Sequence, residues 1–244
     1  MTDTLIPLAE HFHSIQGEGR HTGLPMHFLR FPGCNVGRAQ GHVLAPPGFK
    51  NPVEWNGFAS KPLVVLPNSE VAKVCTDFTG AHFFCDTDYE QHEEMPLDEL
   101  VAETYETTVC FTGGEPLLHQ KKPWFKELFQ KFKQNDVQVH VETSGTIVPK
   151  LEFDWLTVSP KDGWQHGCIA VANQLKFLVS PEHDSYSFLD EVARHMSPLC
   201  EVYLSPIFDP NALVRANLDY AFEILKTYPG WHLGMQWHKF LNLR

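Results

Sequence analysis

The chain has 244 residues, of which 43% are apolar and 20% are charged, and its formal net charge at pH 7 is -11. These values are ordinary for a globular protein with a substantial core, and the acidic balance disfavours binding to the phosphate backbone of nucleic acids. The sequence contains no run of about 18 apolar residues, so we expect no membrane span, and its N-terminus lacks the basic and apolar regions of a secretion signal.

The first part of the chain combines a predicted strand with a long irregular stretch. Arg30 stands near the end of the first predicted strand. Residues 36–82 then hold scattered prolines and only one short apolar run, at residues 63–66. A stretch of this kind inside a compact domain is typical of an insertion. We therefore expect a single domain over residues 1–244, with an insertion at 36–82 that has a hairpin or a short helix of its own.

From residue 96 onward, helix-like and strand-like segments alternate. A helix is predicted to open at residues 96–101, and a second has Phe125, Leu128, Phe129 and Phe132 at helical spacing behind Pro123. Further helices are predicted near 188–195 and 212–228, and strands at 108–111, 137–141, 155–158, 175–179, 202–204 and 232–235. This alternation implies βαβ units, a parallel sheet, and ligands at the carboxyl ends of its strands.

Small polar motifs follow three of the predicted strands directly. They are Thr112-Gly113-Gly114-Glu115, Glu142-Thr143-Ser144-Gly145 and Ser159-Pro160-Lys161. Because glycine has no Cβ, Gly113 and Gly114 would let the backbone approach a ligand closely, although a lone Thr-Gly-Gly is more typical of a tight turn. Together the motifs predict one polar rim on the sheet.

Three cysteines are candidate metal ligands. Cys34 follows a glycine and precedes an asparagine, Cys85 precedes Asp-Thr, and Cys75 lies between them. Three thiolates on a four-iron cluster leave one iron open, which is the geometry that reductive cleavage of S-adenosylmethionine requires. Six cysteines without a secretion signal favour a reducing, cytoplasmic location. The other three cysteines, Cys110, Cys168 and Cys200, are interpreted as packing in a strand, a loop and a strand edge.

Motifs along most of the chain outside residues 36–82 resemble one enzyme family. They are Phe12-His13-Ser14-Ile15-Gln16-Gly17-Glu18-Gly19, Phe28-Leu29-Arg30-Phe31-Pro32-Gly33-Cys34-Asn35, Cys85-Asp86-Thr87, the three strand-end motifs above, and Gln236-Trp237-His238-Lys239-Phe240-Leu241. In these motifs the chain is similar to the 7-carboxy-7-deazaguanine synthase family, which consists of radical S-adenosylmethionine enzymes of queuosine-precursor biosynthesis.

The resemblance implies an α/β fold, a partial (β/α) barrel of the radical S-adenosylmethionine type with an inserted loop near the cluster site. It implies a lyase that converts 6-carboxy-5,6,7,8-tetrahydropterin to 7-carboxy-7-deazaguanine with loss of ammonia. The implied cofactors are a [4Fe-4S] cluster, S-adenosylmethionine and Mg²⁺. The implied partners are the pterin substrate, an external electron donor and a second copy in a homodimer, with no nucleic acid and no membrane.

The resemblance also assigns site residues, none of them as a catalytic acid or base. Cofactor contacts fall on Gly114, Ser144, Ser159, Pro160 and Lys161. Substrate contacts fall on Ile15, Gln16, Gly17, Glu18, Arg30 and Thr112, and the Mg²⁺ ligand is Thr87. His238, expected in a terminal strand, and the carboxylate of Arg244 are weaker candidates for closing the pocket. From the residues alone, a structural ion pair is the alternative for Arg30, and a lone threonine after Cys-Asp, as at Thr87, is more typical of a turn.

The cluster ligands depart from the family pattern. The superfamily usually has C-x3-C-x2-C, whereas this chain has C-x40-C-x9-C, and His82 stands three residues before Cys85. We favour Cys34, Cys75 and Cys85 over a set in which His82 replaces Cys75. Two other functions stay open: a cluster-less relative that binds a pterin or a protein, and another radical enzyme such as a glycyl-radical activase. The motifs at both ends of the chain argue against the activase.

Overall fold

The structure is a computed structural model that describes residues 4–36, 92–181, 186–207, 215–238 and 241 with their side chains. Of residues 38–39, 73–76, 82–84, 208–209, 212–213 and 239–240 it describes the backbone. Among these residues, no helix has both the length and the apolar composition that crossing a bilayer requires.

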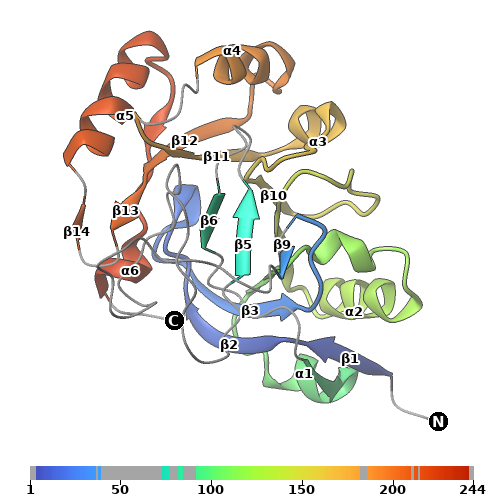
Figure 1. The fold of residues 1–244 in the computed structure, drawn as a ribbon. Helices are drawn as coiled ribbons and strands as arrows, with labels where there is room; N and C mark the ends of the chain where they lie inside the picture. The colour runs from blue at the N-terminus through green and yellow to red at the C-terminus, as the bar shows by residue number, and fades with distance from the viewer. Residues whose placement is uncertain are drawn as a thin grey trace.

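An eight-stranded sheet forms the centre of the fold (Figure 1). Its strands are β2 (Glu10–Ile15), β3 (Pro25–Phe31), β8 (Thr108–Gly113), β9 (Gln138–Thr143), β10 (Trp155–Val158), β11 (Gln174–Val179), β12 (Glu201–Pro206) and β15 (His232–Leu233). From β3 to β15, seven parallel strands pair in chain order, and β2 adds an antiparallel strand at one edge. Within the described residues β2 and β15 do not pair, so the barrel is open. The predicted partial (β/α) barrel is confirmed.

Helices lie between or after the strands along the chain. They are α1 (Leu97–Glu103), α2 (Pro123–Gln134), α3 (His166–Val171), α4 (Tyr186–His195), α5 (Arg215–Thr227) and α6 (Trp237–Leu241). Helices α2 to α5 follow the outside of the curved sheet (Figure 1). In α2, Pro123 suits the first turn, Lys133 complements the negative C-terminal end of the helix dipole, and Phe125, Leu128 and Phe132 are buried. The apolar spacing in the sequence thus predicts α2 correctly.

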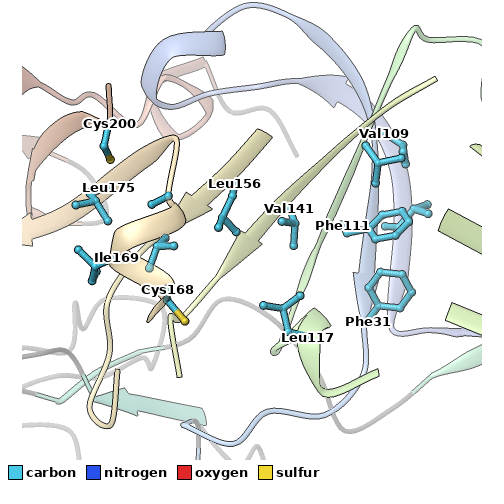
Figure 2. Packing of buried hydrophobic residues seen from close by; sticks show 14 of the residues in the cluster. Phe31, Val109, Phe111, Leu117, Val141, Leu156, Cys168, Ile169, Leu175 and Cys200 are labelled. Carbon is cyan, nitrogen blue, oxygen red and sulfur yellow. The ribbon is translucent and has the colours of Figure 1, made fainter. Parts of the chain in front are cut away.

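The hydrophobic core lies between the sheet and these helices. Strand residues alternate between two faces, so Val109 and Phe111 of β8 and Val141 of β9 join the core. Figure 2 shows this packing, in which the rings of Phe31 and Phe111 meet with centroids 5.2 Å apart. The residues that alternate with them, polar ones included, face the inside of the open barrel. Burial also confirms the packing interpretation of Cys110, Cys168 and Cys200.

Four sequence-based assignments are wrong in detail. Residues 212–213 form a strand, β14 (Ala212–Leu213), because they pair with β13 (Phe208–Asp209), so α5 begins only at Arg215. The strand predicted at 232–235 ends at Leu233. His238 lies in α6 and not in a terminal strand, and Cys168 lies in α3 and not in a loop. For residues 212–213, pairing with residues 208–209 overrides the weak helical pattern.

Short strands outside the main sheet accompany the predicted insertion. β4 (Arg38–Ala39), β5 (Lys73–Thr76) and β6 (His82–Phe84) form a three-stranded antiparallel sheet. The other residues of 37–82 lie outside the described residues, and the limits of the insertion stay a prediction. At the start of the described chain, β1 (Leu5–Leu8) pairs with β7 (Glu93–Pro96).

We predict that Gly113→Ala destabilises the fold more than Gly163→Ala. Both glycines have positive φ, 116° and 80°, and alanine in such a conformation costs about 1 kcal/mol. A Cβ at position 113 would also lie 2.4 Å from the backbone nitrogen of Phe31, whereas a Cβ at 163 would meet nothing within 4 Å. Urea unfolding should therefore show at least about 1 kcal/mol of additional loss for Gly113→Ala. Equal losses would contradict the close packing of β8 on β3.

Candidate functional site

The loop that carries Cys34 is fixed to the polar rim by backbone hydrogen bonds. The N–H of Gly114 donates to the carbonyl of Phe31 over 3.1 Å, and the N–H of Glu115 donates to the carbonyl of Gly33 over 2.9 Å. The partly exposed Cys34 follows directly. The carboxyl ends of β3 and β8 therefore hold the first candidate cluster ligand in place.

Asn35 extends this anchoring to the end of β9. Its side-chain amide donates to the hydroxyl of Thr146 over 2.9 Å. Thr146 in turn exchanges a 2.8 Å hydrogen bond with the hydroxyl of Ser144. The rim thus connects the predicted cluster loop with one of the predicted cofactor-binding motifs.

Glu115 is the buried centre of the rim. Its carboxylate accepts hydrogen bonds from the hydroxyl of Thr143 (2.8 and 2.9 Å), from the N–H of Ser144 (2.9 Å) and its hydroxyl, and from the N–H of Leu117 (3.1 Å). Burial raises the pKa of the Glu115 carboxyl, although these donors act in the opposite direction. The acidic residue of the Thr-Gly-Gly-Glu motif therefore joins the ends of β8 and β9.

The predicted cofactor-binding residues gather around this centre. The N–H of Ser159 donates to the carbonyl of Thr143 over 2.9 Å, and that of Lys161 to the carbonyl of Ser144 over 3.0 Å, with Pro160 between them. The Lys161 ammonium also donates to the Ser159 hydroxyl over 3.0 Å. Ser144, Ser159, Pro160 and Lys161 thus share one rim with Gly114. Their contacts with a cofactor stay a prediction.

Position 113 requires glycine because of packing within the sheet, whereas the sequence predicted that it lets the backbone approach a ligand. Its missing side chain makes room for the backbone of β3, at Phe31 and Arg30, and not for a ligand. Thr112 stands opposite Arg30 in the β3–β8 register. The close approach to a ligand predicted for Gly114 stays a prediction.

A charged network occupies the inside of the open barrel. The ammonium of Lys176, on β11, makes an ion pair with the carboxylate of Glu18, and it lies 3.8 Å from Glu142 on β9. The amide of Gln16 donates to Glu142 over 2.9 Å, and its carbonyl accepts from the N–H of Glu18 over 3.1 Å. Two predicted substrate-binding residues thus meet two strand residues that the sequence reasoning had not assigned.

Electrostatics keep this network ionised. Burial raises the pKa of the Glu18 carboxyl, but the positive charges of Lys176 and His238 and the hydrogen bonds from Lys176 and Gln236 outweigh it and bring the pKa to about 2. Burial lowers the pKa of Lys176, and the charges of Glu142 and Glu18 more than reverse this, so its pKa rises. The ligand-facing side of the sheet therefore carries two carboxylates and one ammonium.

The C-terminal segment packs on the segment that holds Glu18. The amide of Gln236 donates to Glu18 over 2.6 Å, and the N–H of Trp237 donates to the carbonyl of Gly17 over 2.9 Å. A Cβ at Gly17 would lie 2.4 Å from Nδ1 of His238. Gly17 and His238 are thus neighbours, as the idea of pocket closure requires, whereas Arg244 lies outside the described residues.

Arg30 already has partners. Its guanidinium lies 3.7 Å from the carboxylate of Glu10 and 5.4 Å from the centre of the Phe12 ring. The structural ion pair and the substrate contact therefore both stay open for Arg30. Ile15 stands opposite Pro25, at the other end of β3 from Arg30.

A small cavity adjoins the charged network. It is lined by Gln16, Glu18, His21, Cys110, His140, Val141, Glu142, Trp155, Thr157 and Gln174. Nε2 of His21 and Nε1 of Trp155 are buried without a hydrogen-bond partner in the described part of the chain. Burial lowers the pKa of His21, and burial with the nearby His21 lowers that of His140 to about 4, so both imidazoles are neutral. The inside of the barrel thus offers uncharged polar groups beside the charged network.

The strand patterns contained a signal for the residues that sequence reasoning missed. Lys176 is followed by three apolar residues and preceded by Leu175 in its strand, and His140 and Glu142 alternate with valines. Charged side chains at such positions are seldom buried without a partner. This pattern predicts an inward-facing ion pair, but it does not identify Glu18 as the partner of Lys176.

The remaining candidate ligands are described only in part. Cys85 and Thr87 lie outside the described residues, and for Cys75 and His82 only the backbone is described. Cys75 stands opposite Phe83 in the β5–β6 register, while His82 stands opposite Thr76. Residues one step out of register belong to opposite faces of a hairpin, so Cys75 and His82 are alternatives and not a pair. Among residues with described side chains, no three His, Cys, Asp or Glu form a metal site.

We predict that Glu115→Ala destabilises the protein by about 3 kcal/mol or more, because it leaves several buried donors without an acceptor. Glu115→Gln keeps one acceptor oxygen and should lose less. The exposed Glu152 provides the control, since Glu152→Ala should change the free energy of unfolding by less than about 0.5 kcal/mol. Urea unfolding of the three variants measures this order. A loss for Glu115→Ala as small as the control would show that the rim does not depend on this carboxylate.

Comparisons with known proteins agree with this arrangement. A 7-carboxy-7-deazaguanine synthase from Nitratidesulfovibrio vulgaris is 30% identical over 246 residues, covering 96% of this chain and 97% of that protein. One from Synechocystis sp. is 29% identical over 243 residues, covering 98% of this chain and 93% of that protein. No protein-family profile matches the chain.

A solved structure shares the fold. The crystal structure of QueE from Escherichia coli superimposes with a TM-score of 0.62 at 22% identity, covering 96% of this chain and 95% of that one. The similarity to the relatives extends over nearly the whole length of both proteins. The chain belongs to the 7-carboxy-7-deazaguanine synthase family.

Proposed function

We propose that the protein is a radical S-adenosylmethionine lyase that converts 6-carboxy-5,6,7,8-tetrahydropterin to 7-carboxy-7-deazaguanine with loss of ammonia. Relatives that carry this name match nearly the whole chain. The observation that carries the proposal is the network of Gln16, Glu18 and Glu142 inside the open barrel. Its carboxylate and amide groups complement the N–H donors of a pterin ring.

The two ends of the substrate would meet different groups. The ring faces Gln16 and Glu18, with backbone groups of Ile15 and Gly17 beside them. The carboxylate suits Arg30, with Thr112 next to it in the β3–β8 register. The planar guanidinium of Arg30 can bind a carboxylate through two parallel hydrogen bonds.

The donor set fits a [4Fe-4S] cluster held by Cys34, Cys75 and Cys85, because three thiols are ligands that iron prefers. Cys34 supports this fit, since its loop is anchored at Gly33 and Asn35. When bound, a cluster reduced by an external donor supplies the electron that cleaves S-adenosylmethionine.

The chain's own residues would position the other groups. Gly114, Ser144, Ser159, Pro160 and Lys161 hold S-adenosylmethionine at the rim, where Lys161 offers a positive charge to a carboxylate. Thr87 binds Mg²⁺ together with the substrate carboxylate, since Mg²⁺ prefers hard oxygen ligands and keeps few protein contacts. We further propose that the protein is a cytoplasmic homodimer that binds neither nucleic acid nor membranes.

A second candidate keeps the pterin site but lacks the chemistry. The C-x40-C-x9-C spacing favours a cluster-less relative that binds a pterin or a protein partner. Iron incorporation separates the two functions, because the thiols of a binding module have no reason to gather around one metal centre.

We predict that anaerobic reconstitution with iron and sulfide gives a brown protein with about four iron atoms per chain. Cys75→Ala should lose most of this iron, whereas His82→Ala should keep it. Cys200→Ala, which removes a buried thiol of the core, is the control and should also keep it. Iron and sulfide analysis with electron paramagnetic resonance measures the outcome. A colourless wild-type protein favours the binding module, and loss of iron only in His82→Ala favours the histidine ligand set.

We predict that the reconstituted protein forms 7-carboxy-7-deazaguanine and ammonia from the carboxylated tetrahydropterin, and that omission of S-adenosylmethionine abolishes the product. Anaerobic incubation with dithionite and Mg²⁺, followed by chromatography, measures it. Arg30→Met should raise the KM at least about tenfold, because a bidentate contact with the carboxylate is lost. An unchanged KM would instead support the structural ion pair with Glu10.

A further inference from the structure

We infer that Lys176 is a positioning and specificity-determining residue, which holds Glu18 and Glu142 so that they accept hydrogen bonds from a neutral heterocycle with neighbouring N–H donors. The inference rests on the proposed function. It adds a role for a residue that contacts neither the predicted cofactor rim nor any predicted cluster ligand in the described part of the chain.

The geometry gives Lys176 two carboxylate partners from separate parts of the chain. Glu18 lies between β2 and the short helix η1 (Gly19–His21), and Glu142 lies on β9. The ammonium contacts Glu18 and is 3.8 Å from Glu142, and only 13% of the Lys176 side chain is exposed. Removing one member of a buried ion pair leaves an uncompensated charge, so both carboxylates depend on this lysine.

Each carboxylate also accepts a hydrogen bond from a neutral amide. Gln236 donates to one oxygen of Glu18 over 2.6 Å, and Gln16 donates to one oxygen of Glu142 over 2.9 Å. A ligand N–H can take the place of an amide N–H without changing the net charge of the site. Lys176 cannot be displaced in this way, because the two carboxylates would then repel each other in a poorly hydrated place.

The resulting charge selects the orientation of the ligand. Glu18, Glu142 and Lys176 carry a combined charge of about -1, and the positive charge of His238 lies beside them. A donor-rich ring edge is attracted to this charge, whereas a carboxylate is repelled and is directed to Arg30. Lys176 thus compensates part of the negative charge of Glu18 and Glu142. The N–H donors of a neutral ring can then serve as the remaining partners of the two carboxylates.

The acid–base behaviour of Glu18 provides a specific readout. The titratable groups around it are Lys176 on β11, Glu142 on β9, Cys110 on β8 and His238 in α6, and His21 of η1 and His140 of β9 line the same cavity. Burial and Glu142 raise the pKa of the Cys110 thiol, which stays neutral. With Lys176 present, the pKa of Glu18 is about 2, so ligand binding through its carboxylate is retained until the pH falls to that value. Without Lys176, burial raises the pKa, and this binding is lost as the pH falls through the weakly acidic range.

The experiment measures binding of 7-carboxy-7-deazaguanine to the reconstituted protein with S-adenosylmethionine and no reductant, by calorimetry at about pH 8 and about pH 5.5. Lys176→Met should raise the Kd at least about 30-fold. The ratio of its Kd to that of wild type should be larger at the lower pH. Lys176→Arg should restore much of the affinity and the wild-type pH profile. The exposed Lys131, paired with Asp98, supplies the control, since Lys131→Met should match wild type at both pH values.

A double variant tests whether Lys176→Met loses affinity only because the protein no longer folds. In Lys176→Met/Glu18→Gln one of the two carboxylates is neutralised, so Glu18 and Glu142 no longer repel each other. The protein should fold, and the additional pH dependence should disappear. Its loss of affinity should be smaller than the product of the two single losses, because Lys176 acts through Glu18.

The outcomes distinguish this inference from the proposed function. If the reconstituted wild-type protein does not bind the probe, the proposed function is wrong. If wild type binds it, and Lys176→Met binds equally well at both pH values, the role of Lys176 is overturned while the proposed function stands. Multiplicative losses in the double variant would likewise contradict action through Glu18.

Discussion

Two loops join the ends of an open sheet, and the site depends on this connection. β2 and β15 do not pair in the described part of the chain, yet the segment after β2 contacts the segment after β15. Gln236 donates to Glu18, and Trp237 donates to Gly17. Because Glu18 also binds Lys176 on β11, the connection reaches the middle of the sheet. An open barrel thereby obtains a closed ring of contacts without a complete ring of strands.

The two faces of the sheet have different tasks. The apolar residues of β8, β9 and β11 pack against the helices, while the alternate residues point to the ligand side. The rim and the charged network lie on separate parts of this ligand side, one built around Glu115 and the other around Lys176. The same alternation therefore supplies both the stability of the fold and the groups that recognise a ligand.

Local patterns in the sequence predict much of the fold and part of the site. The spacing of Phe125, Leu128 and Phe132 predicts α2, and the motifs that follow β8, β9 and β10 predict the polar rim. The pairing of Lys176 with Glu18 joins residues 158 positions apart, which no local pattern can reveal. For the same reason the sequence misplaces His238, whose surroundings depend on Gly17.

The cysteine spacing shows where local patterns stop being informative. Cys34 is anchored by neighbours that are evident only in three dimensions, such as Thr146. For Cys75 and His82, the register of β5 and β6 assigns the two residues to opposite faces, although they are close along the chain. Distance along the sequence therefore does not distinguish the thiol of Cys75 from the imidazole of His82, and the choice of Cys75 stays a prediction.

The absence of a side chain at Gly17 has a practical consequence for work with this protein. The carbonyl of Gly17 accepts a hydrogen bond from the N–H of Trp237, and the missing Cβ of Gly17 leaves room for the side chain of His238. A C-terminal fusion, purification handle or proteolytic cut that displaces residues 236–238 would also break the hydrogen bond between Gln236 and Glu18. Preparations should therefore carry their handle at the opposite terminus, where Leu5–Leu8 pairs with Glu93–Pro96.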